Sequence, residues 1–85
     1  MAENTETRLA VIAIVVEDMS CVEELNRLLH EYSESIIGRM GIPYPQKSVS
    51  LISVAVDAPS DTINAITGKL GRLKGLTVKA AYSRV

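Results

Sequence analysis

The feature that most constrains this chain is an eight-residue stretch, Leu9 to Val16, in which every residue is apolar. A run this short and rich in valine and isoleucine is typical of a strand buried on both faces. It is far below the ~20 residues that a membrane-spanning helix needs. The residues before it include Glu3 and Glu6 rather than a basic segment. We therefore expect a central strand of a protein sheet, and neither a membrane span nor a signal peptide.

The stretch Val49 to Val56 predicts a second central strand, because both of its faces are apolar. Alternation along a strand places Ile52, Val54 and Val56 on one face, and Val49, Leu51 and Ala55 on the other. Residues 36–42, interrupted by Gly38 and Gly41 and stopped by Pro43 and Pro45, fit an edge strand. Residues 76–82 alternate apolar and polar side chains, which predicts a half-buried last strand.

Two stretches with helical periodicity separate these strands. The first begins where Ser20 and Glu23 have capping-box spacing, and we expect it to end near Ser33. The second has Pro59 in its first turn and Gly75 as its stop. Their apolar stripes consist of Val22, Leu25, Leu28, Leu29 and Tyr32, and of Ile63, Ile66, Leu70 and Leu73.

The predicted order is strand, helix, strand, strand, helix, strand, which is the α+β ferredoxin-like βαββαβ plan. In this plan the two helices cover one face of a four-stranded antiparallel sheet, with residues 9–16 and 49–56 in the centre. We expect one domain, residues 8–85, after a polar disordered leader, residues 1–7. The other face of the central strands needs a second protein surface, and self-association as a homodimer or homotetramer is its simplest source.

Composition excludes several classes of protein. Cys21 is the single cysteine of the 85 residues, so one chain can form neither an internal disulfide nor a four-cysteine metal site. This points to a reducing compartment, the cytoplasm. A formal net charge of -1 lacks the basic excess that binding to phosphate backbones draws on, so we expect no direct nucleic-acid binding. No cofactor-binding pattern is evident.

Few residues are candidates for chemistry. His30, the only histidine, is either a ligand contact or an ordinary surface histidine. Cys21 reads as a structural thiol. No acid-base pair or nucleophile has a spacing that supports catalysis, so we do not expect an enzyme. Gly68 and Gly71 are costly inside a helix, and they indicate either close packing against a partner or simple tolerance.

Arg39 and Tyr44 form the best candidate site for a ligand. They bracket a segment with Gly41 and Pro43, which offers a cation and a phenol beside a rigid loop. With His30, they are predicted at one edge of the sheet, in a pocket that a neighbouring subunit completes. A guanidinium favours an anionic small molecule. The alternative is an exposed arginine and a packed tyrosine that bind nothing.

Nearly the whole chain after the leader resembles a known family. The similarity lies in Leu9 to Asp18, in Leu28 to Glu31, in Gly38 to Tyr44, and in Thr67 to Gly71 with the glycine and strand that follow. The chain resembles the small ACT-like iron-only hydrogenase system regulators, which are related in fold to the C-terminal domain of the nickel-responsive repressor. The resemblance implies an ACT-like domain that acts in regulation through a separate partner, either a DNA-binding protein or a protein of the hydrogenase system.

The sequence differs from these relatives at two of their binding sites, so the ligands of those sites are not expected here. Gly41 and Pro43 stand where the nickel-responsive repressor has metal-binding histidines, so we expect no tight nickel site of that kind. The loop Glu17 to Ser20 lacks the glycine with which ACT domains bind amino acids. Two hypotheses follow: an oligomeric regulatory domain that binds a small ligand, or a protein-interaction module without a ligand pocket.

Overall fold

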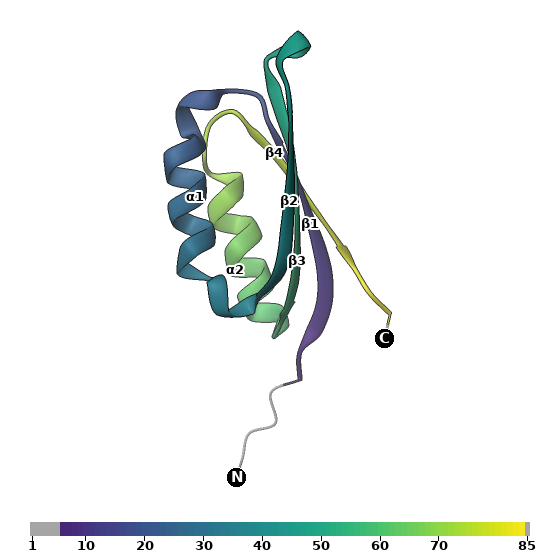
Figure 1. The fold of residues 1–85 in the computed structure, drawn as a ribbon. Coiled ribbons are helices and arrows are strands. Elements are labelled where there is room, and N and C mark those ends of the chain that lie inside the picture. Colours follow the sequence, from purple (N-terminus) through teal and green to yellow (C-terminus); the bar gives the residue numbers. More distant parts are fainter. Residues whose placement is uncertain (1–5, 85) are drawn as a thin grey trace.

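A computed structural model describes residues 6–84. The chain forms β1 (Arg8–Val16), α1 (Val22–Glu31), β2 (Ile36–Tyr44), β3 (Val49–Ala58), α2 (Ser60–Gly71) and β4 (Leu76–Tyr82). The strands make one antiparallel sheet in the order β2-β3-β1-β4. Both helices lie on the same face of this sheet (Figure 1). The predicted ferredoxin-like βαββαβ fold is thereby confirmed, with β1 and β3 in the centre. Of the predicted leader, residues 1–5 lie outside the described residues.

The core lies between the helices and one face of the sheet, and every buried residue in the described part of the chain is aliphatic. The sheet contributes Ala10, Ile12, Ile14, Val16, Val54, Val56 and Ala58, and the helices contribute Leu25, Leu28, Leu29, Ile63, Ile66 and Leu70. The helix stripes are therefore placed as their periodicity predicts. Residues of even number on β1 and β3 face the helices.

The start of the first helical segment differs from the prediction. A 3-10 turn, Met19–Cys21, precedes α1, and the side chain of Asp18 accepts a hydrogen bond from the Ser20 N–H at 3.0 Å. α1 itself begins at Val22 and has no side-chain cap. The predicted Ser20–Glu23 capping box is wrong, because Asp18, an equally good capping residue, takes this role two residues earlier.

Two element ends also differ. Of the two prolines predicted to stop β2, Pro43 does not, since an edge strand tolerates a residue without an N–H, and the strand ends at Tyr44, directly before Pro45. α2 ends at Gly71 rather than at Gly75. Gly75 lies in the turn before β4 with φ +85°, and a Cβ there would collide with the Cβ of Asp18. Its carbonyl accepts a hydrogen bond from the Glu17 N–H at 2.7 Å, so this turn joins the end of β1 to the start of β4.

Candidate functional site

The face of the sheet opposite the helices is not covered by any element within residues 6–84 (Figure 1). Residues that pair directly across strands share a face, so the register defines this surface. We refer to it as the open face. It consists of Leu9, Val11, Ala13 and Val15 of β1, Val49, Leu51, Ser53 and Ala55 of β3, Gly38, Met40, Ile42 and Tyr44 of β2, and Thr77, Lys79 and Ala81 of β4.

Large apolar side chains gather on the open face and remain accessible. On the central strands, Val11 is 45% and Leu51 is 46% exposed, whereas Ile12, the next residue of β1, is fully buried. On the edge strand, Met40 is 63% and Ile42 is 53% exposed. A contiguous apolar surface of this kind marks a site of interaction. The sequence predicted its central strands, but it missed the contribution of β2, for which the alternation of Met40, Ile42 and Tyr44 was the available signal.

The open face is hollowed between β1, β3 and β2. This depression has a volume of about 230 Å³ and is lined by Ala13, Ile14, Val15, Met40, Ile42, Leu51, Ile52 and Ser53. None of these side chains carries a charge, and Ser53 is the single hydroxyl. Lys79 lies on β4 at the margin of the face, and Asp57 lies beside Leu9 at one end. The depression therefore suits apolar side chains rather than a charged metabolite.

The hairpin between β2 and β3 extends past the helices and the end of β1 (Figure 1). Val16, the last residue of β1, pairs with Ser50, so within residues 6–84 the hairpin beyond that point has no third strand beside it. A second hollow of about 330 Å³ lies here, lined by Met19, Pro43, Tyr44, Pro45, Ser48, Val49 and Ser50. Ser48 closes the hairpin with a positive φ of 56°. The hairpin thus continues the apolar surface beyond the body of the domain.

The three predicted ligand residues do not meet within one chain. An Nη2 donor of Arg39 reaches the Oδ1 of Asn26 on α1 at 3.1 Å, so its side chain lies on the helix side of β2. His30 is exposed one helical turn beyond Asn26, on the same side of α1. Tyr44 lies five residues beyond Arg39 on the same strand and pairs with Val49, so it belongs to the open face. Arg39 therefore faces α1, the helix that also carries His30, whereas Tyr44 lies on the opposite face of the sheet.

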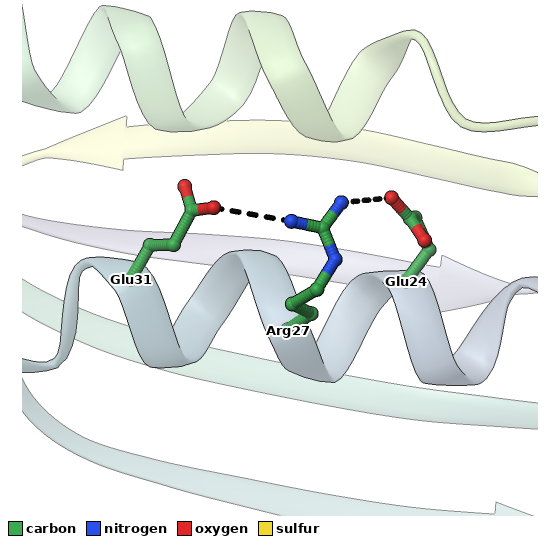
Figure 2. Close-up of polar contacts among 3 residues, drawn as sticks. All are labelled: Glu24, Arg27 and Glu31. Atoms are coloured by element: carbon green, nitrogen blue, oxygen red, sulfur yellow. Dashed lines mark hydrogen bonds and ion pairs between the residues drawn. The ribbon is translucent and has the colours of Figure 1, made fainter.

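The outer surface of α1 carries an ion-pair network. Arg27 pairs with Glu24 and, at 3.2 Å, with Glu31 (Figure 2). Hydrogen bonding to Glu24 raises the pKa of Arg27 above its ordinary value. All three side chains are exposed, and exposed pairs at these helical spacings contribute little to stability. In this network the charge of Arg27 is therefore balanced by the two glutamates on either side of it.

No group of three or more histidine, cysteine, aspartate or glutamate side chains that could hold a metal ion occurs among residues 6–84. Cys21 is half-buried, and its Sγ donates to the carbonyl oxygen of Asp18 at 3.1 Å. Among the described helices, none is long and apolar enough to cross a membrane.

Comparison with known proteins identifies relatives. The model of the TM1266-like family, described as an iron-only hydrogenase system regulator, matches residues 8–80. The solved structure of the uncharacterized protein TM1266 from Thermotoga maritima is similar, with a TM-score of 0.89 and 34% identity over 93% of this chain and 100% of that one. A search of curated proteins gave no match. The chain therefore belongs to the TM1266-like family of iron-only hydrogenase system regulators.

Proposed function

We propose that this chain is a cytoplasmic regulatory domain without enzymatic activity that assembles with copies of itself through the open face. In this account it acts on an iron-only hydrogenase system through a separate protein partner. The observation that carries the proposal is the open face itself, where Val11, Leu51, Met40 and Ile42 are accessible together. Membership of the family supports the regulatory role.

The free energy gained by burying apolar surface supports self-assembly. Burying apolar surface contributes about 25 cal/mol per Å². An 85-residue domain gains less from its own core than a larger one does. The described core is entirely aliphatic and uses one face of the sheet. A second copy would supply an equally apolar surface for the other face, and a two-fold axis would make the contact self-complementary.

The open face favours protein over metabolite as its occupant. Its depression is lined by apolar side chains, while the charged residues Lys79 and Asp57 lie at its margins. A protein surface with aliphatic side chains matches this pattern, whereas a small anion would lose its hydration without gaining hydrogen bonds. The interaction-module hypothesis therefore has the stronger support for this face.

A small anionic ligand is a second candidate function, supported by a different place. At the β2 edge, Arg39 is anchored to Asn26 of α1, the helix that also carries His30. The hollow of about 220 Å³ lined by Gly38, Met40, Ser53 and Ala55 next to Arg39 lies on the open face, so the guanidinium, which bonds to Asn26 on the helix side, does not face it. A guanidinium held in this way suits a carboxylate or a phosphate. Tyr44 would join such a site only from a neighbouring subunit, because within one chain it lies on the other face.

The proposal is tested by placing a charge on the open face. Leu51→Glu should reduce the mass measured by light scattering after size exclusion, because it would bury a carboxylate without a partner. Ser33→Glu is the control, since Ser33 is exposed in the turn after α1, on the helix side of the sheet and outside the open face. A wild-type protein that elutes as a 9.2 kDa monomer at micromolar concentration would contradict the proposal.

The ligand alternative needs its own measurement. Wild type and Arg39→Ala are compared for the rise in melting temperature that carboxylates and phosphates produce, since ligands that bind the native state stabilise it. A rise that is present in wild type and absent in Arg39→Ala supports the site. Equal responses in both proteins would place any anion elsewhere.

A further inference from the structure

The two edges of the sheet are built differently. β2 is interrupted as a pairing edge by a β-bulge between Ile36 and Gly38 and by Pro43. Bulges and prolines are devices that prevent an edge from pairing with another strand. β4 has neither device. It pairs with β1 without a register shift from Leu76, opposite Val16, to Tyr82, opposite Ala10.

The direction of the β4 backbone groups follows from one hydrogen bond. The Ser83 N–H donates to the Leu9 carbonyl oxygen at 2.9 Å. In an antiparallel ladder, hydrogen-bonded and non-hydrogen-bonded pairs alternate along the strand. Residues of odd number on β4 therefore face β1 with their backbone groups. Leu76, Val78, Ala80 and Tyr82 direct their N–H and C=O groups away from the sheet, where no further strand exists within residues 6–84.

The flank of α2 above this edge carries two glycines. The Tyr82 hydroxyl donates to the Asn64 Oδ1 at 3.1 Å, which places Asn64 over the end of β4. Gly68 and Gly71 follow four and seven residues later, on the same flank of the helix. A Cβ built at either glycine meets no atom within 4 Å. Each glycine costs the helix roughly 1 kcal/mol relative to alanine, and no close packing within the described residues offsets this.

We propose that the β4 edge pairs with β4 of a second copy, antiparallel around a two-fold axis, and that the two α2 helices pack against each other at Gly68 and Gly71. This inference rests on the proposed self-assembly and adds a second contact to it. Strands lie ~4.8 Å apart, and helices pack ~8–10 Å apart, so each helix covers about two strands. Extending the sheet across β4 therefore brings the two α2 helices to packing distance, where glycines permit close approach.

The register follows from the same residues. A helix rises ~1.5 Å and a strand ~3.3 Å per residue, so from the level of Tyr82 and Asn64 the two glycines lie at about the level of Ala80 to Val78. An axis at Ala80 would place Lys79 opposite the partner's Ala81. An axis at Lys79 would place two lysines opposite each other, which is unfavourable. We therefore assign the axis to Ala80. Combined with pairing through the open face, this contact gives a tetramer.

The test uses Gly68→Leu, because the isolated chain has room for the side chain whereas the paired helices do not. Sedimentation velocity should show the wild-type tetramer replaced by a species of half its mass, with an unchanged circular dichroism spectrum. Glu23→Leu, which adds the same side chain to the first turn of α1, should keep the wild-type mass. Ala80→Pro removes an outward N–H at the axis and should act like Gly68→Leu.

The outcomes separate this contact from the open face. If Gly68→Leu and Ala80→Pro both keep the wild-type mass, the β4 contact does not exist. If they halve the mass while Leu51→Glu leaves it unchanged, the β4 contact stands and the open-face proposal fails. If Gly68→Leu, Ala80→Pro and Leu51→Glu each halve it, both contacts are present in one tetramer.

Discussion

The two faces of the sheet have nearly the same chemistry and opposite environments. On β1, residues of even number, such as Ile12 and Ile14, are buried beneath the helices, while those of odd number, such as Val11, remain accessible. Both sets are aliphatic, and they differ only in what covers them. A fully apolar strand therefore has two apolar faces, of which the described part of the chain covers one.

The largest expected difference between the faces is in stability. Ile12→Ala should lower the free energy of unfolding by about 2–5 kcal/mol, because it leaves a cavity in a closely packed core. Val11→Ala, one residue away, should cost well below that in dilute protein, since its side chain is accessible in the single chain. Urea denaturation measures both values. If both variants lost the same free energy of unfolding at high dilution, the two faces would not differ in burial within the single chain.

A smaller loss is expected for a substitution in the turn between α2 and β4. Gly75→Ala should destabilise the protein by about 1–3 kcal/mol, because φ is +85° and the new Cβ would collide with Asp18. Gly68→Ala, in open space within α2, is the control and should not destabilise the single chain. Thermal unfolding of both at the same dilution decides this. A Gly75→Ala protein as stable as wild type would show that the turn is not constrained.

Assembly should make stability depend on concentration. If the open face is covered by another copy, the melting temperature of wild type should rise with protein concentration, because association stabilises the native state. Leu51→Glu should weaken this dependence while leaving the melting temperature at high dilution nearly unchanged. Differential scanning calorimetry over a hundredfold range of concentration tests it. A wild-type melting temperature that stays constant over that range argues against assembly.

The smallest effect concerns pH. The hydrogen bond from the Ser20 N–H holds the pKa of Asp18 below its ordinary value. A depressed carboxyl pKa adds stability above the unfolded-state pKa of ~4, and this is lost as pH falls through the folded-state value. Asp18→Asn should therefore flatten the acid side of the stability profile slightly, without changing either face of the sheet. A profile identical to that of wild type would show that this bond contributes nothing.

Much of the fold was predictable because the strands and helices differ clearly in period. The continuous apolar run 9–16 and the two-sided pattern of 49–56 place both strands in the centre of the sheet, where the structure has them. The helix stripe that includes Leu25 and Leu29 identifies the covered side of the domain. These patterns were predictable because the spacing of apolar residues in the sequence indicates directly which side chains are buried.

The candidate site was less predictable, and the reasons are local. Reading Pro43 as the end of the strand put Tyr44 in a loop, where the alternation of faces does not apply. In the structure β2 continues through Tyr44, so Arg39 and Tyr44 point to opposite faces. The bulge at Ile37 adds one residue to β2 and so determines which of the following side chains lie on each face. No pattern in the sequence is strong enough to locate this bulge.

The most direct test of the central claim measures whether the open face is covered in solution. Methyl groups of Val11, Leu51 and Ile42 are compared with those of Ile12 by nuclear magnetic resonance in the presence of a soluble paramagnetic agent. We predict that at assembly concentrations the open-face methyls are protected nearly as well as those of Ile12, and that Leu51→Glu exposes Val11 and Ile42 while Ile12 stays protected. Open-face methyls that relax as accessible groups in the wild-type protein at every concentration would contradict the account.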